Sequence, residues 1–286
     1  GRALETGNKQ SRMSTKRVSI LGCGWLGVPL GASLAKSGYW VNGSVTSAEK
    51  MVQLRESGIS PFRIVLKDNS VDIEDWSFFQ TDVLIISIPP RRVEGIEQLF
   101  PAQIGQLIPY ILKFGIRKVI FISSTSVYPD NKQKATEIDV LQPLKSSGKA
   151  LVLAENLLAA QTEFKTTILR FGGLIGADRN PARFLQKKGM AVANVPVNLI
   201  HLDDCIGIIA AILEKELWGE ILNACCPVHP LKKEFYGKAA QVSGLPIPEF
   251  SDEDSEYKLV DSSKLLDMLG YTFKYNSPVD YLTHNL

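Results

Sequence analysis

The sequence has little net charge. Its 286 residues include 32 Lys and Arg against 30 Asp and Glu, a net charge of +2, and no long run of like charge occurs. Proteins that bind nucleic acids or anionic membrane surfaces through electrostatics carry an excess or a cluster of positive charge. We therefore expect neither nucleic acid nor a membrane as a partner.

Long apolar runs and cysteine motifs are also missing. The longest apolar stretches, such as residues 83–88 and 205–213, are far shorter than the ~20 residues that span a bilayer. The 4 cysteines show no CxxC spacing and no histidine-rich neighbourhood. This pattern predicts a cytoplasmic protein with reduced thiols and no structural zinc.

One glycine-rich stretch organises the chain. Residues 18–21 form a short apolar run that leads directly into Gly22, Gly24 and Gly27, and a helical pattern follows. In a dinucleotide-binding turn the first glycine allows the tight turn, the second admits a pyrophosphate, and the third lets the helix pack on the sheet. The N–H groups at the helix start would then face the phosphates. The alternative is a glycine-rich strand–helix turn that binds nothing.

Strands and helices alternate along most of the chain. This alternation predicts an α/β fold, a Rossmann-type doubly wound parallel sheet with right-handed crossovers. Ligands of such sheets lie beyond the carboxyl ends of the strands. The expected strands are 18–21, 39–45, 62–66, 82–88, 117–122, 166–170 and 220–224, and the expected site rim is 22–25, 44–47, 88–92 and 123–128.

The pattern changes after the last of these strands. We expect residues 13–224 to form the NAD(P)-binding domain and residues 225–286 to form a smaller C-terminal lobe on the substrate side. Residues 1–12 are polar, lack an apolar core and precede Met13, which fits a natural start. We interpret them as an added leader or a disordered segment.

Further stretches occur in an order that is found in a known family. They are 121–128 (FISSTSVY), 168–181 (ILRFGGLIGADRNP), 200–205 (IHLDDC) and 222–231. Together with the glycine turn, they resemble the NAD(P)-dependent epimerase/dehydratase family, the extended short-chain dehydrogenases/reductases, and an atypical branch of it. The resemblance implies oxidoreductase, epimerase or dehydratase activity on a small polar, sugar-like substrate.

The family's catalytic pair, a tyrosine and a lysine four residues apart, is missing here. In the family the tyrosine is the general acid or base, and the lysine lowers its pKa. Matching the Ala-Glu dipeptide at 154–155 to the family places Ser147 and Leu151 at the two positions, and a shifted register gives Lys145 and Lys149. Because no register supplies a phenol, the family's usual proton transfer is not expected.

Three other hydroxyl groups are candidates for proton transfer: Ser124, Tyr128 and Ser147. Ser124 matches the family's serine that hydrogen-bonds the substrate, and the alternative is a serine that caps the end of its strand. Tyr128 could turn toward the site and act as the acid, although a packed loop tyrosine is the commoner arrangement.

Four arginines are further candidates. Arg91 and Arg92 could contact a cofactor or substrate phosphate, or simply begin an exposed helix. Arg170 and Arg179 could contact the substrate, and structural ion pairing is the alternative.

The nucleotide preference depends on the end of the second strand. An NAD site places an acidic residue on the ribose about 20 residues after the first glycine, but residues 42–47 contain none. Ser44, Thr46 and Ser47 can instead hydrogen-bond a 2′-phosphate, which favours NADP slightly over NAD. The expected cofactor-binding residues are Gly22, Cys23, Gly24, Trp25, Leu26, Gly27, Ser44, Thr46, Ser47, Ile88, Pro89 and Ser123.

The sequence leaves two functions open. The first is an NAD(P)-dependent oxidoreductase or epimerase that acts on a small molecule with nonstandard acid/base residues. The second is a catalytically inactive NADP-binding sensor or scaffold that kept the cofactor site. The expected partners are a small-molecule substrate and, as one option, a second copy of the chain in a homodimer.

Overall fold

A computed structural model describes residues 16–176, 178–185 and 191–285 of the chain. The leader expected at residues 1–12 lies outside this range. Among the described residues, no helix is both long enough and apolar enough to cross a membrane.

The centre of the molecule is an eight-stranded sheet. Neighbouring strands run parallel, except that β4 runs antiparallel to β3. The predicted doubly wound parallel sheet is confirmed, and β4 is an addition at its edge. In order across the sheet, the strands are β12 (Ile221–Ala224), β8 (Lys165–Phe171), β6 (Lys118–Ser124), β5 (Val83–Ile86), β1 (Arg17–Leu21), β2 (Trp40–Val45), β3 (Ser60–Leu66) and β4 (Val71–Ile73).

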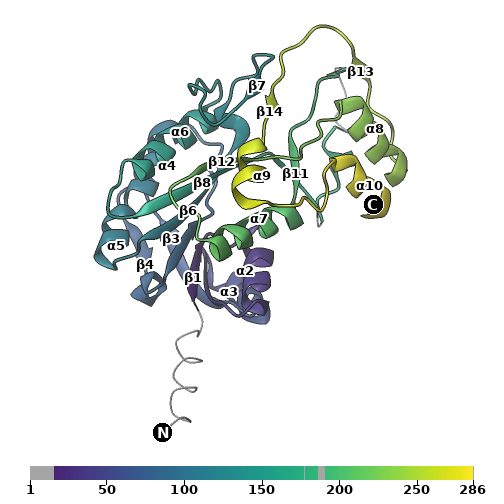
Figure 1. Cartoon of the computed structure of the whole chain (residues 1–286). Helices are drawn as coiled ribbons and strands as arrows, with labels where there is room; N and C mark the ends of the chain where they lie inside the picture. The colour runs from purple at the N-terminus through teal and green to yellow at the C-terminus, as the bar shows by residue number, and fades with distance from the viewer. Residues whose placement is uncertain (1–15, 177, 186–190, 286) are drawn as a thin grey trace.

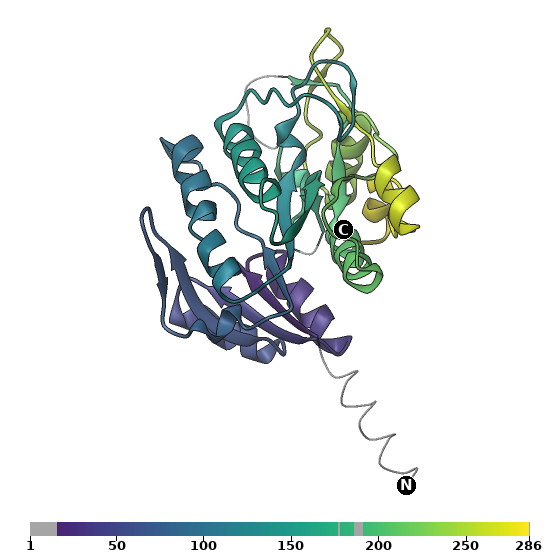
Figure 2. The same ribbon diagram turned by 60° about the vertical axis from the view of Figure 1, so that its left-hand side comes forward.

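Helices cover both faces of this sheet (Figures 1 and 2). Because both faces are covered, the central strands are apolar on both sides. Ile85 packs in one hydrophobic cluster, whereas its neighbours Leu84 and Ile86 pack in the other, as the two-residue period of a strand requires. One face carries α2 (Gly27–Lys36), α3 (Met51–Glu56) and α7 (Leu202–Lys215), and the other carries α4 (Ile96–Gly105), α5 (Ile108–Lys113) and α6 (Ser146–Ala159).

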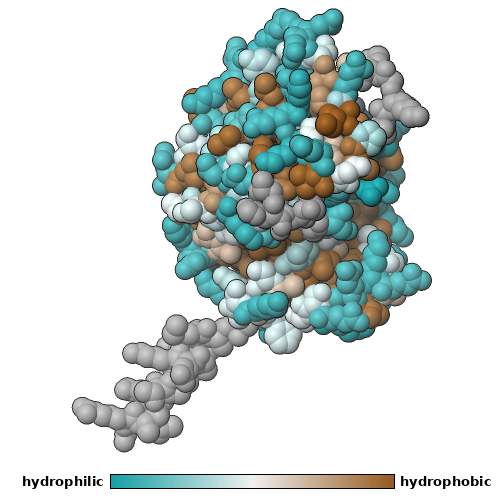
Figure 3. Space-filling view, turned by 90° about the vertical axis from the view of Figure 1, so that its right-hand side faces the viewer, coloured by the Kyte–Doolittle hydropathy of each residue, from teal (hydrophilic) through white to brown (hydrophobic). Residues whose placement is uncertain are grey.

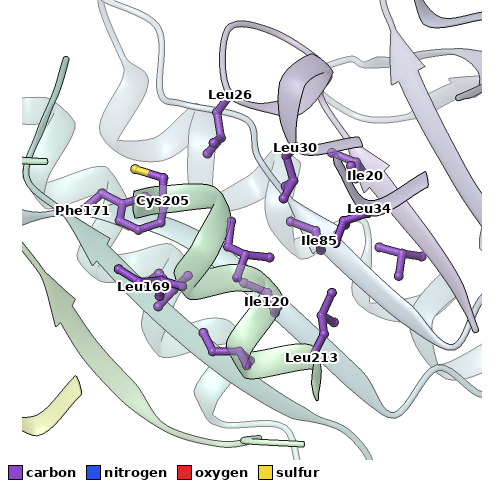
Figure 4. Packing of buried hydrophobic residues seen from close by; sticks show 14 of the residues in the cluster. Ile20, Leu26, Leu30, Leu34, Ile85, Ile120, Leu169, Phe171, Cys205 and Leu213 are labelled. Carbon is purple, nitrogen blue, oxygen red and sulfur yellow. The ribbon is translucent and has the colours of Figure 1, made fainter. Parts of the chain in front are cut away.

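The start of α2 is anchored by a leucine stripe. Leu26, Leu30 and Leu34 are at most 6% exposed and pack in one cluster with Ile20 and Ile85 (Figure 4). Their four-residue spacing puts them on one helix face. This packing fixes α2 against β1 and β5, and therefore fixes the glycine turn that joins β1 to α2.

Residues 96–113 form two helices, and neither of their prolines causes the division. Pro101 lies inside α4, and the division falls between Gly105 and Ile108. Pro109 lies in the first turn of α5, where a backbone N–H has no intrahelical partner in any case.

A smaller lobe lies beside the carboxyl ends of the strands (Figure 1). Its hydrophobic cluster combines Ile175 and Leu199, which precede residue 225, with Phe235 and Leu282, which follow it. The division at residue 225 stays a prediction, since segments on both sides of it build this core. The lobe contains α8 (Lys232–Ser243), α10 (Pro278–Asn285) and the strand pairs β9 (Gly173–Ile175) with β11 (Leu199–His201) and β10 (Val192–Ala193) with β13 (Phe250–Ser251).

Two further elements connect the C-terminal part to the sheet. Strand β14 (Leu259–Val260) pairs with β7 (Lys134–Ala135), and α9 (Ser263–Leu269) packs beside β12. The molecular surface on the side that carries the lobe mixes hydrophobic and hydrophilic residues (Figure 3).

The packing of α6 generates a stability prediction. A Cβ at Gly148 would lie 2.5 Å from the Ser126 carbonyl oxygen and 2.8 Å from Pro143 Cβ. We expect Gly148→Ala to lower the free energy of unfolding by about 1–3 kcal/mol, because backbone must shift to admit the methyl group. Urea denaturation of the whole chain measures this change.

The matched control is Gly105→Ala at the end of α4. A Cβ there meets only Leu157 Cδ1, at 3.8 Å, an ordinary contact. Its stability should be unchanged or raised by up to about 1 kcal/mol. Equal effects of the two substitutions would contradict the close packing of α6 against the turn after β6.

Candidate functional site

The three glycines of the turn after β1 differ in the space around them. Gly22 has φ +96°, and a Cβ there would lie 2.7 Å from the Ser87 carbonyl oxygen. A Cβ at Gly27 would lie 2.7 Å from the Gly22 carbonyl oxygen. At Gly24 a Cβ would meet nothing within 4 Å. The fold itself therefore needs glycine at the first and third positions, whereas the second faces open space, where a ligand can approach the backbone.

Two cavities meet at this turn, with volumes of about 540 and 490 Å³. Gly24, Ser87, Ile88 and Pro89 line both of them. Each volume is in the range of small-molecule sites, and the shared wall means that one long ligand can occupy both. We call the larger one the β6-side cavity and the smaller one the β2-side cavity.

The β2-side cavity is lined by the end of β2 and the loop after it. The Ser44 hydroxyl accepts a hydrogen bond from the Gly22 N–H (2.9 Å), which holds the glycine turn against β2. Burial raises the pKa of the Cys23 thiol to about 12, so this side chain is a neutral part of the wall. The charged side chains among its lining residues are Lys50 and Arg91, both cations.

The β6-side cavity is lined by the ends of β6 and β8, by α6 and by the segment after β9. Its polar side chains include Ser123 and Ser124, and its charged side chains are Arg92 and Arg179. Leu151 of α6 also lines it. In the register that matches Ala154-Glu155 to the family, the position of the family's lysine therefore faces this cavity with an apolar side chain.

Most of the expected cofactor-binding residues line one cavity or both. Gly27 packs against the turn and Ser47 precedes η1 (Ala48–Lys50) without a capping hydrogen bond, and neither is among the lining residues. Close packing is the role expected of Gly27 as the third glycine, and contact of either residue with a cofactor stays a prediction. The residues that do line a cavity are Gly22, Cys23, Gly24, Trp25, Leu26, Ser44, Thr46, Ile88, Pro89 and Ser123.

The structure brings one of the three expected proton-transfer residues to the β6-side cavity. Ser124 lines it and also accepts a hydrogen bond from the Ser126 N–H (3.1 Å), so its own hydroxyl proton stays available to a ligand. Ser147 lies on α6, one turn before Leu151, and is not among the lining residues. A role of Ser147 in proton transfer therefore stays a prediction.

The expectation for Tyr128 needs correction. Its side chain is 3% exposed, and its hydroxyl donates to Asn223 Oδ1 (2.7 Å) and accepts from Arg170 Nη1 (2.8 Å). Burial raises the pKa of this phenol, although the Arg170 guanidinium opposes the rise. Tyr128 is thus a packed core residue in a hydrogen-bond network and does not line either cavity.

The same network reaches the β6-side cavity through Ser123. Arg170 Nη2 lies 2.6 Å from Glu155 Oε1, and both side chains are 3% exposed. Ser123 donates its hydroxyl to Glu155 Oε2 (2.6 Å). Arg170 is therefore a structural ion-pair partner, the alternative given above, and Ser123 presents an oxygen that has already donated its proton.

One residue that sequence reasoning missed is Lys258, from the segment before β14. Its ammonium group donates to the Thr125 and Tyr128 carbonyl oxygens (2.8 and 3.1 Å). These contacts hold the C-terminal segment against the turn after β6. No sequence signal marks this lysine, because its partners are backbone atoms 130 or more positions away.

Comparison with known proteins gives a relative that is similar to this chain over nearly its whole length. No family model matches the sequence. Protein YeeZ of Escherichia coli K12 is 34% identical over 268 residues, which are 92% of this chain and 98% of YeeZ. The match therefore covers nearly the whole length of both proteins.

Solved structures with the same fold have lower sequence identity. A putative NAD-dependent epimerase/dehydratase from Methylobacillus flagellatus has a TM-score of 0.73 at 23% identity, over 93% of this chain and 96% of that one. UDP-glucuronic acid 4-epimerase from Bacillus cereus, in complex with NAD, has a TM-score of 0.74 at 20% identity, over 93% and 98%.

The chain thus has the fold that is found in solved structures of NAD-dependent epimerases and dehydratases. By sequence, it belongs to the family of the Escherichia coli protein YeeZ.

The buried ion pair generates a second stability prediction. Glu155→Gln would leave Arg170 buried without its counter-charge, and we expect it to lower the free energy of unfolding by about 3–5 kcal/mol. Glu163→Gln, on an exposed glutamate outside the network, is the control and should change stability little. Urea denaturation compares the two, and equal stabilities would contradict the structural role assigned to Glu155.

Proposed function

We propose that this chain binds a nicotinamide dinucleotide across the two cavities and acts as an oxidoreductase or epimerase on a small molecule in the β6-side cavity. The observation that carries the proposal is the open space at Gly24, where the two cavities meet. A pyrophosphate at that point would lie at the start of α2, where N–H groups and the helix dipole favour negative charge.

The two cavities would hold the two halves of the dinucleotide. Ser44, Thr46 and Lys50 would surround the adenosine ribose in the β2-side cavity. The nicotinamide end would occupy the β6-side cavity beside Ser123 and Leu151. When bound, the nicotinamide ring supplies hydride chemistry.

The side chains of the β2-side cavity support a preference for NADP. Among the described lining residues no carboxylate is present to bind the ribose hydroxyls, and Lys50 and Arg91 supply positive charge for a 2′-phosphate. The similar solved structures named above are described as NAD-dependent or contain NAD. The preference therefore rests on this chain's own residues.

Proton transfer would follow a route other than the family's. Ser124 can donate its hydroxyl to a carbonyl or alcohol oxygen of the substrate, and Leu151 forms an apolar wall. No described lining residue of the β6-side cavity has a side chain that titrates near neutral pH. The proton that accompanies the hydride would therefore come from solvent or from the substrate itself.

The same observation favours a second candidate, a protein that binds the dinucleotide and reports its redox state without turnover. Leu151 faces the cavity where the family has a lysine, and no phenol lines it. Oxidation of bound NADPH by a panel of carbonyl compounds separates the two functions. Steady turnover supports the enzyme, whereas tight binding without turnover supports the sensor.

The setting and assembly are also proposals. The four cysteines are all free and buried, which fits a reducing compartment such as the cytoplasm. A small-molecule substrate is the proposed partner. A homodimer stays a prediction.

Gly24→Asp tests the phosphate site. The substitution fits the free protein, since a Cβ there meets nothing within 4 Å, but the carboxylate would occupy the pyrophosphate position and repel it. We expect the melting temperature of the free protein to stay the same and the rise caused by NADPH to disappear.

Gly237→Asp in α8 is the control, because it adds the same charge at a glycine with room for a Cβ, away from both cavities. It should keep the NADPH-induced rise in melting temperature. A normal rise in Gly24→Asp would contradict the proposed binding mode.

Lys50→Ala tests the nucleotide preference. Removing the ammonium group from the β2-side cavity should weaken NADPH binding by about three- to tenfold and leave NADH binding unchanged. Calorimetry with both nucleotides measures this difference, and Lys36→Ala, on the last turn of α2, is the control. A similar loss for NADH would show that Lys50 does not read the 2′-phosphate.

A further inference from the structure

The charged side chains that line the β6-side cavity are all positive. Arg92 and Arg179 are the charged side chains that line it, and no Asp or Glu does so among the described residues. The shared wall where the pyrophosphate would lie is formed instead by Gly24, Ser87 and the residues after it. The positive charge of this cavity thus comes from residues outside the wall that the two cavities share.

Arg179 is held by an aromatic ring. Its guanidinium carbon lies 4.2 Å from the centroid of the Trp25 ring, in a cation–π contact. The Trp25 indole N–H donates to Asp178 Oδ1 (3.0 Å), which fixes the orientation of the ring. The glycine turn after β1 and the segment after β9 are therefore joined across the β6-side cavity, which both Trp25 and Arg179 line.

The cation–π contact with Trp25 leaves the N–H groups of the Arg179 guanidinium available to a ligand. Its side chain makes no ion pair and no hydrogen bond with any described residue. Stacking uses the face of the guanidinium group and leaves its N–H edge available, and that edge matches a carboxylate or phosphate in two parallel hydrogen bonds. The Asp178 carboxylate accepts its hydrogen bond from Trp25 and forms no ion pair with Arg179 among the described residues.

We propose that the substrate is a small anion whose carboxylate or phosphate group is bound by Arg179, and that Trp25 is the positioning residue that sets the guanidinium group for it. This inference rests on the proposed function, since it assumes that the dinucleotide fills the adjoining space. Arg92 adds a second positive charge to the same cavity.

The cavity also limits the size of the substrate. Its volume of about 540 Å³ must hold the nicotinamide end of the cofactor as well. A compact anion fits the remaining space better than a nucleotide-sugar does. The proposal therefore separates this chain from similar structures whose names specify UDP-sugars.

Three ligands with one carbon skeleton test the charge requirement: glycerol 3-phosphate, glycerate and uncharged glycerol. Each is titrated by calorimetry into the full chain saturated with NADPH, with UDP-glucose as a fourth ligand. We expect at least one of the two anions to bind, and glycerol and UDP-glucose not to bind. Failure of both anions, or equal binding of glycerol, would overturn the inference.

Arg179→Gln tests the assigned residue. It should weaken binding of the anion at least about tenfold, the loss expected for a charged hydrogen-bonding partner, and should leave NADPH affinity within twofold. Arg183→Gln removes the same charge four residues later, outside both cavities, and should leave both affinities unchanged. A loss of NADPH affinity in Arg179→Gln alone would instead place Arg179 on the cofactor's pyrophosphate.

Two Trp25 variants test whether Trp25 positions the Arg179 guanidinium group for the anion. Trp25→Phe keeps the aromatic face and should retain most of the anion affinity, whereas Trp25→Leu should lose about as much as Arg179→Gln does. Equal affinities in the two variants would contradict the positioning role. Failure of NADPH to bind the unmodified chain would overturn the proposed function itself. Because NADPH binding is measured before any anion is added, this outcome is distinguished from a failure of the anions to bind.

Discussion

Close backbone contact at the turn after β1 is the constraint on which the rest of the site depends. Gly22 lies against the Ser87 carbonyl group at the end of β5, and Gly27 lies against Gly22 itself. No side chain larger than hydrogen fits at either place, so the backbone at these two glycines lies directly against neighbouring backbone. The space that this leaves in front of Gly24 is where the two cavities join.

A second constraint is the buried network that reaches the β6-side cavity through Ser123. Glu155 and Arg170 form an ion pair that β6, α6 and β8 enclose, and the network uses hydroxyl groups of Ser123 and Tyr128. Buried charges need such partners, because an unpaired one is costly in a low-dielectric interior. The Ser123 and Tyr128 hydroxyl protons are therefore used in this network, whereas the hydroxyl proton of Ser124 stays available.

The site therefore combines a cofactor-type architecture with unusual chemistry. The paired cavities and the open glycine fit the proposed dinucleotide, while α6 presents the apolar Leu151 to the β6-side cavity. Positive charge enters the cavity elsewhere, from Arg92 and Arg179. Such an arrangement favours orientation of a negatively charged molecule over transfer of a proton from a protein side chain.

The sequence by itself determined the doubly wound sheet and the glycine turn, because both depend on local signals, namely apolar runs and glycines next to them. It also indicated the absence of the catalytic pair. Only the tertiary structure decided that Tyr128 is buried, that Ser147 does not line the cavity, and that Lys258 and Trp25 join distant segments. The physical reason is that these roles depend on partners from other elements, such as Arg170 on β8, and no local pattern specifies such partners.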